Sequence, residues 1–155
     1  MLVFVQVLNM AQFYKLNIKD IYKETDDTSV VSFEVPVHLQ SVFKYAQGQH
    51  LTLKADIDGE DVRRSYSLCS SPLENEWKVA IKQIPGGKFS TFVNNEVKAG
   101  DLIEVMEPSG NFGVTVKPED SKNYIFFAAG SGITPVLSML KTHLKAEPNA
   151  TCKLF

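Results

Sequence analysis

The chain has 155 residues, a formal net charge of −2, 44% hydrophobic residues and 22% charged residues, values that are ordinary for a soluble globular domain. It has no block of basic residues, which argues against nucleic acid or an anionic membrane as a partner. Cys69 and Cys152 are the two cysteines; they cannot form a disulfide framework or an iron–sulfur site with about four thiolates, and they indicate a reducing, cytoplasmic environment.

The first 11 residues are apolar, but this segment is too short to cross a membrane. It also lacks the positively charged start and the small-residue cleavage site of a signal peptide. We interpret residues 1–11 as an N-terminal extension that precedes the folded domain. Polar and apolar residues then alternate over 12–18 and 28–35, which predicts two strands with a turn at 25–27.

A hairpin is predicted for residues 49–57 and 62–69, because Asp58-Gly59 between them is a strong turn signal. Its second strand brings together a fixed cation, an aromatic ring and several small hydroxyl groups. Arg64 can pair with a phosphate in a bidentate manner, and Tyr66 can cover a planar heterocycle while its hydroxyl group forms a hydrogen bond.

Ser67 and Ser70 add hydroxyl groups that can bond to ring heteroatoms. Because side chains alternate along a strand, Ser67 can join Arg64 and Tyr66 only if the strand bends or ends there. When this stretch is taken alone, an edge strand with a solvated arginine and a tyrosine in the core is the favoured interpretation.

Residues 76–84 alternate again, and Pro85-Gly86-Gly87 leads from them into apolar residues at helical spacing. This order predicts a strand, a glycine turn and a short helix. Free N–H groups at a helix start bind anions, and glycines let a phosphate approach the backbone. Ser90 can cap the helix or contact the phosphate. Most Gly-Gly pairs are simply turns, and solvation explains Lys88 as well as phosphate pairing does.

A further strand is predicted at 102–106, followed by a loop at 108–113. About six antiparallel strands with turns at this spacing are typical of a barrel or a sandwich, which we assign to residues 12–116. The polar stretch 116–123 then marks a domain boundary.

The pattern changes at residues 124–129, a continuous apolar run that predicts a strand buried on both faces of a parallel sheet. A glycine-rich turn follows, and we expect a helix with Thr134 as its N-cap and Pro135 as its first residue. The predicted apolar stripe of this helix consists of Val136, Leu137, Leu140 and Leu144.

Another strand begins at residue 151, so residues 123–155 predict the opening βαβ unit of a nucleotide-binding domain. This unit is too short for a doubly wound sheet. On periodicity alone, a nucleotide-binding role and a plain βαβ unit are about equally supported.

From about residue 12 onward, the chain resembles the ferredoxin–NADP reductase superfamily, most closely the oxygenase-type reductases of the phenylacetyl-CoA epoxidase kind. The resemblance rests on four motifs in the family's order and spacing, a combination that is specific although no single motif is. The motifs are R-x-Y-S-x-x-S at 64–70, the glycine loop at 86–90, P-x-G-x-F at 108–112 and G-x-G-x-T-P at 130–135. Gln47 departs from the family, which often has proline there.

The resemblance implies a six-stranded antiparallel Greek-key barrel that binds FAD, followed by an incomplete NAD(P)-binding domain. Arg64 would hold the pyrophosphate and Tyr66 would stack on the flavin, while Ser67 and Thr134 would act at the reacting ring. The other implied cofactor-binding residues are Ser70, Lys82, Gly86, Gly87, Lys88, Phe89, Ser90, Gly130, Gly132 and Pro135.

The implied function is that of an NAD(P)H-dependent oxidoreductase, in which a hydride from nicotinamide reduces the flavin and single electrons pass to a ferredoxin or an oxygenase component. Family members continue for about another domain, so we expect the chain to be incomplete for turnover. Unpaired strand edges at 124–129 and 151–155 predict self-association. A non-catalytic barrel for assembly or regulation, and one half of a split reductase, remain as alternatives.

Overall fold

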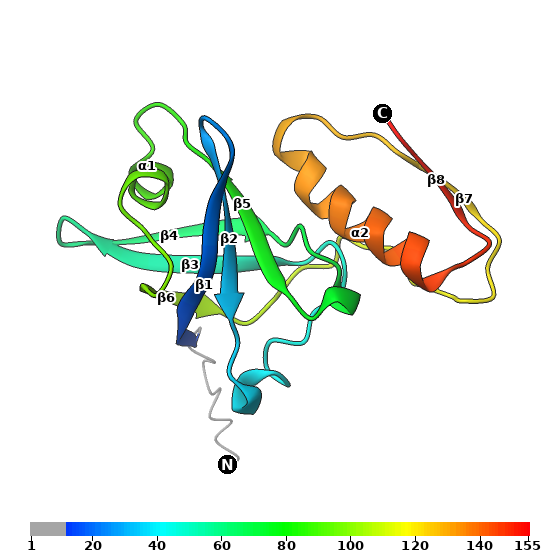
Figure 1. Ribbon diagram of the computed structural model, residues 1–155, viewed down its shortest axis with the longest axis horizontal. Helices are drawn as coiled ribbons and strands as arrows, with labels where there is room; N and C mark the ends of the chain where they lie inside the picture. Colours follow the sequence, from blue (N-terminus) through cyan, green and yellow to red (C-terminus); the bar gives the residue numbers. More distant parts are fainter. Residues whose placement is uncertain (1–11) are drawn as a thin grey trace, which may run out of the picture.

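The computed structural model describes residues 12–155, which form a β-sheet unit with a smaller βαβ unit beside it (Figure 1). Six antiparallel strands make one sheet in the order β4-β3-β6-β1-β2-β5. The strands are β1 (Phe13–Thr25), β2 (Thr28–Glu34), β3 (His50–Ile57), β4 (Glu60–Ser67), β5 (Trp77–Lys82) and β6 (Leu102–Met106).

The six predicted antiparallel strands are confirmed, but they do not close into a complete barrel. The two edge strands of the sheet, β4 and β5, are not paired as strands, and an isolated bridge between Leu68, just after β4, and Val79 connects the chain there. Helix α1 (Lys88–Asn95) packs against both edge strands. We call the opening between β4 and β5, with α1 beside it, the seam.

The core of the six-stranded sheet unit consists of apolar side chains that alternate with more exposed ones along the strands. In β3, Leu51 and Leu53 are fully buried, and α1 contributes Phe89 and Val93, each 1% exposed. Burying an apolar side chain of this size contributes about 1.5–3 kcal/mol. The indole of Trp77 is also buried, and its Nε1–H donates to a main-chain carbonyl at 2.7 Å, so its polar atom is satisfied.

The remaining elements are β7 (Asn123–Phe126), α2 (Ile133–Ala146), β8 (Thr151–Leu154) and the short 3₁₀ turns η1 (Val37–Leu39), η2 (Pro72–Glu74) and η3 (Gly130–Gly132). Strands β7 and β8 are parallel neighbours, as expected of a βαβ unit. Among residues 12–155, no helix is both long enough and apolar enough to span a membrane.

Strand β1 is longer than the alternation predicted. It continues beyond residue 18 to Thr25, with a register shift between Ile18 and Asp20. An irregularity of this kind inserts a residue into the pairing and moves side chains to the other face. The period-two pattern therefore breaks at residue 18 although the strand does not end there.

The expectation that residues 124–129 are buried on both faces was wrong. Strand β7 ends at Phe126, and Ile125 and Phe127 are 59% and 77% exposed. Within the described residues, α2 covers one face of the β7–β8 pair and no second helix covers the other.

Two expectations about α2 were also wrong. The N-cap position is Gly132, which η3 places directly before Ile133, so Thr134 and Pro135 already lie in the first helical turn. The Thr134 hydroxyl donates to the carbonyl of Ser131 at 2.9 Å instead of capping the helix. The predicted stripe holds for Val136, but Leu144 is 50% exposed.

The helix turns a different set of residues inward because it packs on two surfaces. Val136 and Met139 meet β7 and β8, while Ser138 and Thr142 are buried toward the turn that contains η2. A single apolar stripe cannot describe a helix with one apolar contact face and one polar contact face.

Candidate functional site

Strand β4 carries Arg64 on the face of the sheet that otherwise forms the core. Tyr66 lies opposite Leu51, and Arg64 lies opposite Leu53. Directly opposed residues of an antiparallel pair share a face, and both leucines are fully buried. Arg64 is nevertheless exposed, because β4 is an edge strand and the sheet is open beside it. Arg64 therefore lies between Val62 and Tyr66 on this face, at the point where the face reaches solvent.

The guanidinium group of Arg64 has no acidic partner among residues 12–155. It donates from Nη1 to the carbonyl oxygen of Arg63 at 2.6 Å. The adjacent Arg63, on the opposite face, pairs with both carboxylate oxygens of Asp61 at 2.8 and 2.7 Å. Arg64 therefore presents donors that suit a phosphate or a carboxylate.

Tyr66 and Ser67 follow at the end of β4. The Tyr66 ring is partly buried, with its centroid 5.9 Å from that of Phe89 and the two planes tilted by 33°. Burial raises the pKa of Tyr66, and the charge of Arg64 offsets this only in part. The phenol is therefore protonated at neutral pH and can donate a hydrogen bond. Ser67 is the last residue of β4. The strand therefore ends at the residue where an end or a bend is needed for Ser67 to lie on the same side as Arg64 and Tyr66.

The glycine turn before α1 leaves the start of this helix without a capping side chain. Gly87 occupies the N-cap position, and no side chain bonds to the cap. A Cβ on Gly86 would meet no atom within 4 Å, so the backbone is open there. The Ser90 hydroxyl is buried in the turn, 3.3 Å from the Gly87 carbonyl that accepts its proton and 3.3 Å from the Ile84 N–H that donates to it. The first-turn N–H groups of α1 can therefore receive an anion.

Contacts between α1 and β4 place Arg64 beside this helix start. Lys88 Nζ lies 2.6 Å from a carboxylate oxygen of Glu60, and Phe89 packs against Tyr66. Arg64 lies between Glu60 and Tyr66 on β4, so its position on the strand runs alongside the start of α1. Because Phe89 is 1% exposed, its side chain cannot contact a ligand.

Ser70 and Lys82 are placed differently from the residues that border the seam. Ser70 is fully buried, and its hydroxyl is engaged with the Tyr45 hydroxyl, the Glu76 carbonyl and the Lys78 N–H at 2.9, 2.9 and 3.1 Å. The ammonium of Lys82 is exposed and lies 3.1 Å from a carboxylate oxygen of Asp27.

The predicted nicotinamide residues, Gly130, Gly132, Thr134 and Pro135, belong to the βαβ unit and not to the seam. Open surface surrounds both glycines, since a Cβ on either would meet no atom within 4 Å. Four side-chain contacts connect this unit to the turn that follows β4, and they involve Ser138, Lys141, Thr142 and Lys145.

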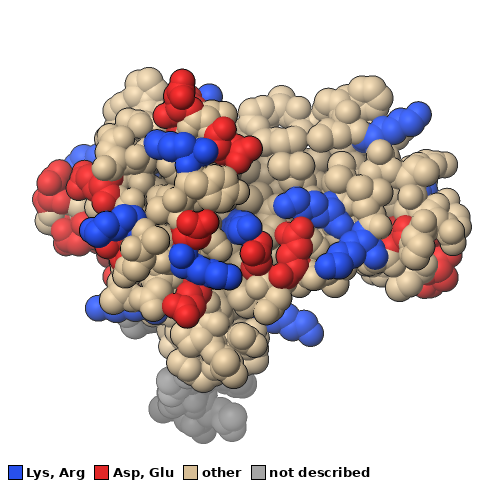
Figure 2. All heavy atoms as spheres, in the orientation of Figure 1, with Lys and Arg blue, Asp and Glu red and all other residues tan. Residues whose placement is uncertain are grey.

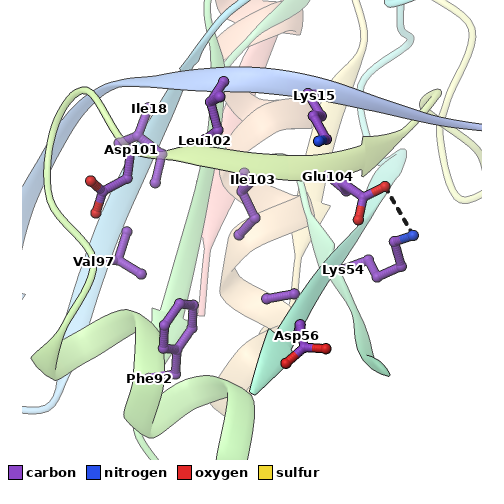
Figure 3. A pocket seen from close by; sticks show the side chains of 11 residues that line it. Lys15, Ile18, Lys54, Asp56, Phe92, Val97, Asp101, Leu102, Ile103 and Glu104 are labelled. Carbon is purple, nitrogen blue, oxygen red and sulfur yellow. Dashed lines mark ion pairs between the residues drawn. The ribbon is translucent and has the colours of Figure 1, made fainter. Parts of the chain in front are cut away.

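Two hollows on the described part of the chain lie away from the seam. One, of about 400 Å³, is bordered by Phe92, Ile103 and the Lys54–Glu104 pair at 2.9 Å (Figure 3). The other, of about 470 Å³, lies between the loops at 46–49 and 110–116. Neither contains Arg64, Tyr66 or Ser67. In the view of Figure 2, acidic and basic side chains are interspersed, so charge of one sign does not single out a site on that face.

The sequence interpretation missed the residues that hold the turn after β4. Ser71 and Glu74 form a capping box for η2, and the S-x-x-E spacing could have revealed it. Tyr45, Ser138 and Thr142 carry no local signal, because their partners Ser70 and Ser71 lie 25 to 71 residues away.

Comparison with known proteins agrees with this architecture. Residues 15–113 match the family described as the oxidoreductase FAD-binding domain. The chain is 43% identical over 141 residues to a 1,2-phenylacetyl-CoA epoxidase subunit from Escherichia coli (strain K12), covering 91% of this chain and 40% of that protein. It is 40% identical over 131 residues to the ferredoxin reductase component of 3-ketosteroid-9-alpha-monooxygenase from Rhodococcus rhodochrous, covering 83% and 36%.

Among solved structures, phthalate dioxygenase reductase superimposes with a TM-score of 0.74 at 30% identity, over 92% of this chain and 42% of that one. The chain thus spans about two fifths of the length of these three relatives. The family match extends over most of the chain and over all six strands of the sheet except the first two residues of β1. The chain belongs to the oxidoreductase FAD-binding domain family of the ferredoxin–NADP reductase superfamily.

Proposed function

We propose that residues 12–116 are the FAD-binding half of an NAD(P)H-dependent electron-transfer reductase, and that residues 123–155 begin its NAD(P)-binding domain. The observation that supports this most strongly is the position of Arg64. It is a cation without an acidic partner in the described chain, and it lies on the inward face of an edge strand beside an uncapped, glycine-led helix start. A pyrophosphate would satisfy both groups at once.

In this proposal Arg64 holds the pyrophosphate together with the backbone of the glycine turn. Tyr66 covers the flavin ring, and Ser67 offers its hydroxyl to the ring's reactive edge. The edge of β5 that ends at Lys82 meets the polar side of the flavin through its backbone. The contributing turn residues are Gly86, Gly87, Lys88, Phe89 and Ser90. When bound, FAD accepts a hydride and releases electrons one at a time; the chain binds and orients it.

Ser70 and the βαβ residues have separate roles in the proposal. Because its hydroxyl group is engaged inside the protein, Ser70 supports the end of β4 and does not reach the cofactor with its side chain. Gly130 and Gly132 leave room for a nicotinamide nucleotide, with Thr134 and Pro135 beside it and the Thr134 hydroxyl near the reacting ring.

We further propose that electrons leave toward a ferredoxin or an oxygenase component. One relative is named as the ferredoxin reductase component of a monooxygenase. Another is described as transferring electrons from pyridine nucleotides to a [2Fe-2S] centre. These names support an acceptor of the same class for the protein that contains this chain.

The experiment that tests flavin binding is an absorbance scan of the purified chain before and after FAD is added. We expect a yellow protein, or an apoprotein whose added FAD shows a shifted and resolved visible band. A chain that leaves the FAD spectrum unchanged at high concentration would contradict the proposal. Reduction of a dye by NADH or NADPH then separates a working reductase from a barrel that binds flavin without turnover.

The exposed face of the βαβ unit supports self-association. Phe127 and Phe155 are 77% and 67% exposed, and their rings stack with centroids 5.5 Å apart. Exposed apolar side chains beside unpaired strand edges favour pairing with another chain. Sedimentation velocity over a wide range of concentration is expected to show oligomers, and Phe127→Asp is expected to reduce them. A monomer at every concentration would refute this part of the proposal.

A further inference from the structure

Two buried hydroxyl contacts join α2 to the segment that follows β4. Ser138 donates from Oγ to the carbonyl oxygen of Ser70 at 2.6 Å, and the hydroxyl oxygens of Ser71 and Thr142 lie 2.8 Å apart. Thr142 is 2% exposed, and the other three residues are fully buried. We call these four residues the hydroxyl latch.

The proton positions in the hydroxyl latch follow from its neighbours. The Leu73 N–H donates to Ser71 Oγ at 3.2 Å, and the Thr142 hydroxyl donates to the carbonyl of Ser138 at 2.6 Å. A hydroxyl group has one proton, so Ser71 must be the donor to Thr142. Every hydroxyl group of the hydroxyl latch then has a partner, and this satisfied arrangement favours one placement of α2 over slightly shifted ones.

The hydroxyl latch holds the chain immediately after Ser67. Ser70 also bonds through its own hydroxyl to the backbone at the start of β5, while Leu68 bridges to Val79. The segment 68–71 is therefore tied to β5 on one side and to α2 on the other. Helix α2 starts directly after Gly130–Gly132, and Ser138 lies about 7.5 Å along its axis from Ile133.

We propose that Ser138 and Thr142 are positioning residues. Through Ser70 and Ser71 they fix the end of β4, and with it Ser67 at the flavin, relative to the Gly130–Gly132 loop where the nicotinamide enters. This inference rests on the proposed function, because it assumes that the flavin binds at Ser67 and the nicotinamide at the Gly130–Gly132 loop. Ser138 and Thr142 belong to the βαβ unit and contact neither cofactor. They would nevertheless help to determine the position of the flavin.

Thr142→Val tests the proposal, because it keeps the side-chain shape and leaves the buried Ser71 hydroxyl without an acceptor. We expect FAD affinity to fall by about tenfold, which corresponds to about 1.4 kcal/mol, because FAD binding must then itself order the end of β4. We also expect the visible circular dichroism of bound FAD to change, and Thr142→Ser to restore both. Lys145→Ala is the matched control, since it removes an exposed 3.1 Å contact from α2 to the carbonyl of Leu73.

Amide hydrogen exchange of residues 67–71 in the apoprotein supplies a readout that needs no flavin. Exchange is expected to be faster in Thr142→Val and in the milder Ser138→Ala than in Lys145→Ala. If the wild-type chain binds no FAD, the proposed function fails and the positioning role fails with it. If the wild type binds FAD, and Thr142→Val lowers the melting temperature without changing affinity or dichroism, the hydroxyl latch is purely structural and the inference is overturned. Unchanged exchange at 67–71 would overturn it as well.

Discussion

Replacing Arg64 with alanine is expected to weaken FAD binding by about ten- to a hundredfold. A charge-assisted hydrogen bond to a phosphate contributes about 1.5–3 kcal/mol, and each 1.4 kcal/mol is a factor of about ten in affinity. No carboxylate in the described chain depends on Arg64 for charge pairing, so its loss should leave folding almost unchanged. Titration of apoprotein with FAD, followed by flavin fluorescence, measures the affinity directly.

The neighbouring arginine provides a control of equal charge. Arg63 lies on the opposite face of β4 and pairs with both oxygens of Asp61. Arg63→Ala should therefore leave FAD affinity unchanged, whereas Arg64→Lys should lie between wild type and alanine because it keeps the charge without the planar guanidinium. Equal losses for Arg63→Ala and Arg64→Ala would show that only net charge matters, and an unchanged affinity in Arg64→Ala would remove the central residue of the proposed site.

Features that depend only on residues close together in the sequence were predictable. Asp58 and Gly59 both adopt positive φ, 55° and 79°, as the tight hairpin between β3 and β4 requires. The register that places Ser67 opposite His50 follows from this turn. The start of α1 is equally local, since Gly86-Gly87 forms the turn between the end of β5 at Lys82 and the helix, and Phe89 and Val93 recur at helical spacing.

Features that depend on what covers a surface were not predictable. An apolar run such as Tyr124–Ala129 reads as doubly buried whether or not a second layer is present, and here Ile125 and Phe127 face outward. The hydroxyl of Ser70 looked available to a cofactor because Tyr45, its buried partner, lies 25 residues away in the chain. Small polar residues on α2 gave no signal either, since a serine is equally compatible with solvent and with a buried carbonyl.

The largest loss of stability is expected for Gly48→Ala. Gly48 has φ of +87°, and a Cβ there would lie 1.5 Å from the carbonyl oxygen of Phe112 and 2.7 Å from its carbon. The left-handed conformation alone costs a non-glycine residue about 1–2 kcal/mol. Overpacking adds about 1–3 kcal/mol or more, and here the obstacle is backbone, which cannot rotate away. We expect Gly48→Ala to lower the free energy of unfolding by more than about 3 kcal/mol.

Gly59→Ala separates the two contributions, because Gly59 also has positive φ, +79°, but no atom lies within 4 Å of its added Cβ. It should lose about 1–2 kcal/mol, or about 2–8 °C in melting temperature for a chain of this size. Urea unfolding of both variants measures the difference, and equal losses would mean that the loop at Phe112 moves aside without penalty. Since β3 begins at His50 and holds Ser67 through strand pairing, Gly48→Ala should also weaken FAD binding, whereas Gly59→Ala, at the far end of the hairpin, should not.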